Sequence, residues 1–269
     1  MGLLEIAAIE RQLSLWLGRR LPRPIRRMLS PLYTGFEQLQ RKVTIWDDEL
    51  LETLREFYKI EKTPELKRML KEAEGRNREF FQKSLPKNRD EEMKFYRESP
   101  YYPLVLANWH MTLQQTRFRN WVIRQSRGTV LDYGAGIGDL SLKLWQRNHP
   151  VTYLDVDKSQ NLQFATHLFS KNKADIKIIP TESIEGIGMG TFDTIICLDV
   201  IEHLPEPKKT VEMFHDHLHR EGRLIATNIY YNPRKAPDSH EHKPTGLTQE
   251  VMKGIGFREV NGFMWLRTG

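Results

Sequence analysis

Residues 130–142, VLDYGAGIGDLSL, contain the pattern with the clearest chemical meaning. Gly134, Gly136 and Gly138 follow an apolar run at every second position. Glycine lets the backbone pass close to a ligand, and a helix beginning after the glycines would direct unpaired N–H groups at that ligand. The pattern therefore predicts a ligand-binding loop.

Two carboxylates beside the glycines narrow the class of ligand. A dinucleotide-binding loop has the pattern G-x-G-x-x-G, and its third glycine would fall at Asp139 in this chain. Asp132 stands two residues before the first glycine. A carboxylate there would repel a pyrophosphate, whereas it suits a ligand that carries an ammonium and a sulfonium group.

The elements that must position this loop can be outlined from residue 129 onward. Short apolar runs (TVLDYG, VTYLDV, IKIIP, FDTIICLDV and RLIATNI) alternate with helical stretches near residues 138–147, 159–171 and 207–219. Strands that alternate with helices predict a parallel sheet with helices on both faces. Because ligands bind beyond the carboxyl ends of such strands, the residues just after each strand are the site candidates.

Several ordered segments of this half together resemble the class I S-adenosylmethionine-dependent methyltransferases. The glycine run is similar to their first motif, VTYLDVD to the second strand, and FDTIICLDVIEHLPEP to the fourth strand and loop of the ubiquinone O-methyltransferase-like enzymes. HREGRLIATNIY and LTQEVMKGIGFREVNGFMWLRTG resemble the fifth strand and the closing helix and hairpin. The resemblance covers residues 128–269 and implies an α/β fold with a Rossmann-like, seven-stranded, mostly parallel sheet.

The same resemblance implies S-adenosyl-L-methionine as the cofactor. Asp155, at the end of the second strand, would accept hydrogen bonds from both ribose hydroxyls, with Asp157 as the alternative. The family often has an acidic residue near the adenine amino group after the third strand, and here Thr181 occupies that position with Glu182 next to it. The implied cofactor-binding residues are Asp132, Gly134, Ala135, Gly136, Gly138, Asp155, Val156, Glu182 and Asp199.

Methyl transfer from a sulfonium is an in-line displacement, so the protein mainly aligns donor and acceptor and excludes water. A hydroxyl or amine acceptor must also lose a proton, which a general base can take. Glu202 and His203 follow the fourth strand and are the first candidates for a catalytic role. The alternative for His203 is that it only orders the loop or caps the next helix.

A second group of polar residues follows the fifth strand. His240 and His242, flanked by Asp238 and Glu241, lie in YYNPRKAPDSHEHKP. Their spacing matches no tight zinc pattern, and we expect no metal there. A loop that closes over the acceptor would make His240 a catalytic candidate and His242 an acceptor contact; a plain surface loop is the alternative. His215, His217 and His219 are expected on the surface of a helix.

The N-terminal half is expected to be helical. We expect a helical unit over residues 1–98 that forms the acceptor pocket or a lid, a helical connector over 99–127, and the methyltransferase domain over 128–269. Helices are predicted at about 36–60 and 64–83, and one more from residue 104 to the end of the connector. Aromatic residues before the first strand suit a flat or apolar acceptor, and the alternative is interdomain core. The acceptor-binding candidates there are Tyr101, Tyr102 and His110.

Charge is unevenly distributed along the chain. Residues 1–128 hold 25 Lys+Arg against 17 Asp+Glu, and residues 129–269 hold 16 against 18, which gives +8 and −2. Arginines at positions 19, 20, 23, 26 and 27 beside an amphipathic helix are compatible with either ordinary helix packing or peripheral membrane contact. The single cysteine, Cys197, fits a reducing compartment, and no apolar run reaches the ~18–20 residues of a membrane span. We therefore expect a cytoplasmic chain.

Three functions are compatible with these patterns. The first is methyl transfer to a small, moderately apolar molecule. The second is RNA methylation, which the basic N-terminal half favours. Nucleic acid is nevertheless not the expected partner, because no RNA-binding module is visible and residues 198–201 read LDVI instead of an N-P-P-Y-type tetrad. The third is a non-catalytic module that keeps the cofactor fold for assembly.

Overall fold

The computed structural model describes residues 38–84, 89–181, 190–230 and 244–269, together with Gly35. By their internal contacts the described residues form two compact units. One contains the residues up to Lys83 and Tyr101–Gln125, and the other contains Ser84–Pro100 and Ser126–Gly269. Helix α5 (Arg89–Glu98) contacts helix α9 (Gln160–Lys171) and so joins the second unit. This grouping differs from the expected boundaries at residues 98 and 127.

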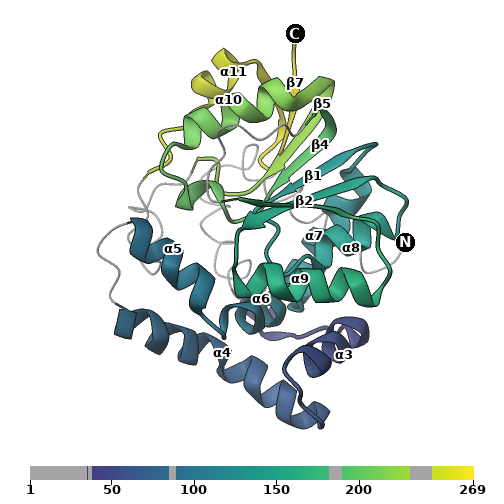
Figure 1. Cartoon of the computed structure of the whole chain (residues 1–269). Helices are drawn as coiled ribbons and strands as arrows, with labels where there is room; N and C mark the ends of the chain where they lie inside the picture. Colours follow the sequence, from purple (N-terminus) through teal and green to yellow (C-terminus); the bar gives the residue numbers. More distant parts are fainter. Residues whose placement is uncertain (1–34, 36–37, 85–88, 182–189, 231–243) are drawn as a thin grey trace. The chain divides into compact units, whose positions relative to one another are not determined.

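The second unit contains a seven-stranded sheet in the order β3-β2-β1-β4-β5-β7-β6 (Figure 1). The first five strands pair in parallel, and β7 pairs antiparallel with both β5 and β6. The predicted fold class is therefore confirmed. The strands are β1 (Val130–Tyr133), β2 (Val151–Val156), β3 (Lys177–Thr181), β4 (Phe192–Cys197), β5 (Leu218–Ala226), β6 (Phe257–Asn261) and β7 (Met264–Arg267).

Helices cover both faces of this sheet. Figure 1 shows α8 and α9 on one side and α10 and α11 on the other. Two of these helices begin at hydroxyl caps: Ser159 Oγ accepts from the Leu162 amide at 3.0 Å, and Thr248 Oγ1 accepts from the Val251 amide at 3.2 Å. The helical elements between the strands are α8 (Asp139–Trp145), α9, the short 3-10 helix η1 (Ile201–His203), α10 (Pro207–His217) and α11 (Gln249–Ile255).

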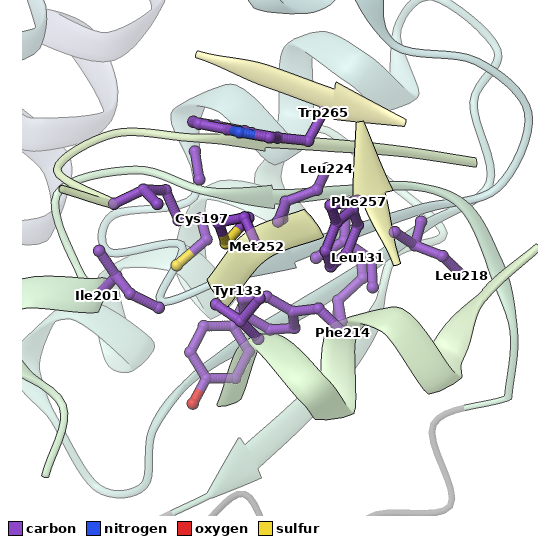
Figure 2. Close-up of a cluster of buried hydrophobic side chains, with 14 of the residues drawn as sticks. Leu131, Tyr133, Cys197, Ile201, Phe214, Leu218, Leu224, Met252, Phe257 and Trp265 are labelled. Atoms are coloured by element: carbon purple, nitrogen blue, oxygen red, sulfur yellow. The ribbon is translucent and has the colours of Figure 1, made fainter. Parts of the chain in front are cut away.

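Side chains on one face of the sheet form the core shown in Figure 2. Leu131 and Tyr133 alternate with Asp132 along β1, so the two apolar side chains share one face and the carboxylate points to the other. Tyr133 meets Phe214 of α10 edge-to-face, with ring centroids 5.0 Å apart. Because this register is set by burial, it also fixes where the polar residues at the strand ends lie.

The first unit consists of helices in the described residues, as predicted. Two of the predicted helices are interrupted, however. Residues 43–47 break the one expected at 36–60: Thr44 pairs with Thr112 in an isolated antiparallel bridge, as suits the β-branched run VTI. The helix expected from residue 104 is broken at Thr112, whose hydroxyl caps the next helix by accepting from Gln115 N at 3.3 Å. Residues 38–42 are helical, and the longer helices are α3 (Asp48–Phe57), α4 (Thr63–Ser84), α6 (Tyr102–His110) and α7 (Leu113–Gln125).

Candidate functional site

The loop between β1 and α8 has the conformation that its glycines predict. Gly134, Gly136 and Gly138 have φ angles of 67°, 58° and 74°, in the left-handed region that side chains rarely adopt. Space is restricted as well. A Cβ atom at Gly134 would lie 2.4 Å from Val200 Cγ2, and one at Gly138 would lie 2.7 Å from Phe169 Cζ. Glycine is therefore required at both positions for conformation and for space.

Strand β2 holds this loop through backbone and side-chain hydrogen bonds. The amides of Gly134 and Ala135 both donate to the Leu154 carbonyl, at 2.8 and 3.0 Å. From beneath, the buried Tyr153 hydroxyl donates to the Gly136 carbonyl at 2.6 Å. Sequence reasoning missed Tyr153, because an apolar strand with one tyrosine gives no sign of which backbone group the hydroxyl reaches.

Asp155 connects the end of β2 to the glycine loop. Its Oδ2 accepts from the Gly136 amide at 2.6 Å, and its Oδ1 accepts from the Val156 amide at 2.7 Å. Burial raises the pKa of Asp155 to about 7, and the two amide bonds and the nearby Asp132 carboxylate act in smaller measure, the amides lowering it and Asp132 raising it. Asp157, the alternative ribose ligand, has a side chain that is 34% exposed beside Lys158. Of the two aspartates, Asp155 is the one that is hydrogen-bonded to the glycine loop.

Asp132 lies beneath the loop, on the face of the sheet that α8 covers. Its side chain is buried, and its Oδ2 accepts from the Ser141 hydroxyl at 2.6 Å. Tyr153, the neighbour of Asp132 in the register of β1 and β2, has its pKa raised by burial and by both carboxylates, Asp155 and Asp132. The carboxylates of Asp132 and Asp155 therefore lie next to the glycine loop and favour a cationic ligand over an anionic one.

The carboxyl ends of β4 and β5 are joined by a second polar cluster. Asp199 and Asn228 both have positive φ angles, 54° and 56°, which are uncommon for residues other than glycine. Thr227 Oγ1 accepts from the Asp199 amide at 2.6 Å and donates to Asp199 Oδ1 at 2.8 Å, and Asn228 Nδ2 donates to the same oxygen at 3.2 Å. Thr227 and Asn228 were not identified from the sequence, because their role depends on facing Asp199 across two neighbouring strands.

Glu202 belongs to this cluster. Its Oε1 accepts from Asn228 Nδ2, while its Oε2 is buried and has no hydrogen-bond partner among the described residues. Burial raises the pKa of Glu202 to about 7; in smaller measure its own backbone amide lowers the pKa, Asp199 raises it, and the side-chain amide of Asn228 lowers it. A carboxyl group that changes protonation near neutral pH at a strand end can accept or donate a proton.

His203 follows Glu202 at the end of η1 and lies half-buried beside α5. Its Nδ1 is 3.5 Å from the hydroxyl oxygen of Tyr96, and the two rings meet edge-to-face with centroids 6.3 Å apart. Both residues belong to the sheet-containing unit. The structure thus brings Glu202 and His203 to the carboxyl end of β4, close to the cluster around Asp199.

Other candidates lie elsewhere. Glu182, His240 and His242 are outside the described residues, as are the arginines at positions 19–27. Tyr101, Tyr102 and His110 belong to the helical unit, at the beginning and end of α6. His215 and His217 lie on α10, but His215 is not on its surface as expected, because its ring packs edge-to-face against Phe257 and its Nε2 is buried. His219 is wrongly placed by the helix prediction, because α10 ends at His217 and β5 already begins at Leu218. Among the described residues no group of three or more His, Cys, Asp or Glu could hold a metal ion.

Comparison with known proteins agrees with this architecture. A family described as a methyltransferase domain matches residues 69–242, which is more than half of the chain. The chain therefore belongs to the methyltransferase domain family, and the predicted resemblance to the class I S-adenosylmethionine-dependent enzymes is confirmed. S-adenosyl-L-methionine, the predicted cofactor, is the cofactor of this class.

Curated relatives of this chain include ubiquinone biosynthesis O-methyltransferases. The one from Pseudomonas paraeruginosa is 29% identical over 119 residues, which are 43% of this chain and 51% of that protein. The one from Psychrobacter cryohalolentis is 32% identical over 109 residues, which are 39% of this chain and 42% of that protein. The chain spans about half the length of the curated relatives it matches.

A solved structure shows the same fold. The magnesium protoporphyrin IX methyltransferase of Synechocystis PCC 6803, with bound S-adenosylmethionine, has a TM-score of 0.50 and 18% sequence identity, with 66% of this chain and 95% of that chain covered. At this identity the likeness concerns the fold alone.

The described residues fit a cofactor of this class. The glycines hold the backbone of the loop close to neighbouring side chains, and the carboxylates of Asp132 and Asp155 lie beneath and beside the loop. These two carboxylates suit the cationic and hydroxyl-bearing parts of S-adenosylmethionine and would repel a pyrophosphate. Asp155 would keep its bond to the Gly136 amide while it accepts from hydroxyl groups, because a carboxylate offers about four acceptor positions.

Proposed function

We propose that the protein transfers a methyl group from S-adenosylmethionine to a small, moderately apolar acceptor by in-line displacement. The observation that carries this proposal is the placement of two polar groups at one edge of the sheet. The glycine loop with Asp155 follows β1 and β2, and Asp199, Glu202 and His203 follow β4, which neighbours β1. In parallel α/β sheets this edge is where ligands bind.

The cofactor residues divide into two groups with different tasks. Asp155, Val156, Ala135 and the glycines would hold the adenosine part, since the loop after β1 and the end of β2 are hydrogen-bonded to each other. Asp132 and Asp199 would attract the cationic part. Bound S-adenosylmethionine supplies an electrophilic methyl group on a sulfonium, so that the residues of this chain need only align the acceptor, exclude water and accept a proton.

Glu202 and His203 are proposed to act on the acceptor. When the acceptor's oxygen or nitrogen forms its bond to the methyl carbon, the carbon–sulfur bond breaks and the acceptor must release its proton. His203 is the proposed base, and the buried Oε2 of Glu202 is proposed to bind a polar group of the acceptor, because a buried oxygen without a partner costs about 1–3 kcal/mol. His240, in the loop after β5, remains a second proposed catalytic residue.

Four further residues are proposed to bind the acceptor. Tyr101, Tyr102 and His110, with His242 from the loop after β5, are the proposed acceptor-binding residues. Aromatic side chains suit a flat or apolar acceptor. The names of the relatives, O-methyltransferases, give a precedent for an oxygen as the methylated atom. Within the described ranges every helix is too short or too polar to cross a lipid bilayer. A cytoplasmic setting, with peripheral membrane contact through the N-terminal basic segment, remains a proposal.

A methyl-transfer assay tests this function. The full chain is incubated with S-adenosylmethionine labelled in the methyl group and with a panel of catechols, phenols, carboxylic acids, small amines and total RNA. We expect label in at least one small aromatic hydroxyl compound and none in RNA. Label in RNA alone, or S-adenosylhomocysteine binding without transfer to any member of a broad panel, would overturn small-molecule methylation in favour of the RNA or non-catalytic alternative.

A further inference from the structure

We propose that Tyr96 is a positioning residue for His203. Its contact with the imidazole ring fixes the orientation and the tautomer of that ring, so that His203 can act as the general base. The inference rests on the proposed function, because it assigns His203 the acceptor's proton. It concerns a residue from helix α5, outside the strand ends from which the other site residues come. Nothing in the sequence pattern of the N-terminal half pointed to Tyr96.

The contact that supports this proposal joins segments 107 residues apart in the chain. The Tyr96 oxygen lies 3.5 Å from His203 Nδ1, at the long end of hydrogen-bond distances, and the rings are edge-to-face at 78°. Catalytic hydrogen bonds are often long without substrate and shorten when it binds. The edge-to-face packing keeps the two rings in register even at this distance.

Helix α5 is well placed to hold Tyr96. Phe95, the preceding residue, is buried and meets the Tyr96 ring edge-to-face with centroids 5.4 Å apart. The helix contacts α9, the helix that follows β2 and Asp155. Tyr96 is therefore anchored to the sheet unit through α5, and its hydroxyl is directed at a ring nitrogen that belongs to the loop after β4.

The direction of this bond determines what His203 can do. A neutral imidazole has one N–H and one lone pair. If Nδ1–H donates to the Tyr96 oxygen, the lone pair is left on Nε2, which can then take the proton that the acceptor releases. The imidazolium formed keeps its Nδ1–H bond to Tyr96, and the proton on Nε2 later passes to water. In this arrangement Tyr96 never touches the acceptor and acts only through His203.

Two measurements test the role of Tyr96. The first is the ring 15N spectrum of the full chain labelled at histidine, in which the His203 signals among nine histidines are assigned by their loss in His203→Gln. We expect wild type to carry the proton mainly on Nδ1. In Tyr96→Phe, which keeps the ring and loses only the hydroxyl, we expect the ratio to move toward Nε2–H about threefold or more, as the loss of one hydrogen bond allows.

The second measurement is kinetic and uses the compound from the acceptor panel that accepts label best. Tyr96→Phe should lower kcat about tenfold, a part of the 10²–10⁴-fold that general bases contribute, and leave the KM for S-adenosylmethionine within about twofold. Tyr58→Phe is the matched control, because Tyr58 is also half-buried but lies in the helical unit. It should change neither the His203 signals nor kcat.

The two measurements separate this inference from the proposed function. A wild-type His203 protonated mainly on Nε2, or a tautomer ratio that Tyr96→Phe leaves unchanged, overturns the role of Tyr96 even in an active enzyme. An equal response in Tyr58→Phe overturns it as well, because the effect would then be unspecific. The spectrum needs no acceptor, so an inactive protein with the expected tautomer would contradict methyl transfer and leave the Tyr96–His203 pairing supported.

Discussion

Replacing Asp155 with asparagine should make the apo protein more stable at alkaline pH. Burial raises the pKa of this carboxyl from its ordinary value of 3.8 to about 7. At about 1.4 kcal/mol per pKa unit, ionised Asp155 costs the folded protein roughly 4 kcal/mol relative to the unfolded chain. The substitution removes the charge but leaves one of the two amide donors, Gly136 or Val156, without an acceptor, at a cost of about 1–3 kcal/mol.

The sign of the effect depends on pH. A carboxyl whose pKa is raised in the folded state binds more protons there than in the unfolded chain between pH 4 and pH 7. Its contribution to stability is therefore fully present below pH 4 and is lost as the pH rises through 7. At pH 8.5 the Asp155→Asn protein should exceed wild type by about 1–3 kcal/mol, the difference between the relieved charge and the lost bond. At pH 5 it should be equal or less stable.

Urea unfolding of the apo protein at pH 5 and pH 8.5, followed by tryptophan fluorescence, measures this crossover. Asp157→Asn is the matched control, because its carboxylate lies two residues further on and is partly exposed. It should change the unfolding free energy by less than about 0.5 kcal/mol at either pH. If Asp155→Asn lowers the unfolding free energy equally at pH 5 and pH 8.5, the raised pKa of a buried Asp155 carboxyl is refuted.

Two further predictions concern the loop and the cluster after β4. Gly134→Ala should lower stability by about 1–3 kcal/mol more than Gly246→Ala. Both glycines have positive φ angles, but only the new Cβ at Gly134 would meet a described side chain, at 2.4 Å from Val200. Equal losses in thermal unfolding would contradict the close packing against Val200. Asn228→Ala removes one of the two donors that lower the pKa of Glu202, so that pKa should rise further. The loss of apo stability should therefore be larger at pH 8.5 than at pH 5. A loss independent of pH would show that Asn228 does not act on Glu202.

Several features were predictable because they depend on local sequence. The glycine loop and the alternating strands and helices from β1 to β5 follow from patterns within 30 residues, whereas the closing hairpin was implied by the family resemblance. The position of Asp155 at the end of β2 was also predicted, since an apolar strand that ends in an acid is visible in VTYLDV. Its bond to the Gly136 amide was not, because it spans two strands.

Contacts between distant segments account for the rest. Thr227 and Asn228 become part of the site only because β4 and β5 are neighbours, and Tyr96 only because α5 packs with the sheet unit. The interruptions at Thr44 and Thr112 likewise arise from a bridge between residues 68 positions apart, which overrides the helical periodicity on either side. Hydrophobic periodicity predicts helices and strands, whereas the functional site depends on which helices and strands become neighbours in the fold.

The most direct test of the central claim is the affinity of S-adenosylhomocysteine, measured by calorimetry for wild type, Asp155→Ala and Asp157→Ala. If the loop after β1 and the end of β2 hold the cofactor, wild type binds it and NADH does not bind. Asp155→Ala should lose about 1.5–3 kcal/mol, roughly 10- to 100-fold in affinity, as expected for hydrogen bonds to a charged group, and Asp157→Ala should stay within a few-fold of wild type. Absence of binding to wild type, or a larger loss in Asp157→Ala than in Asp155→Ala, would contradict the account.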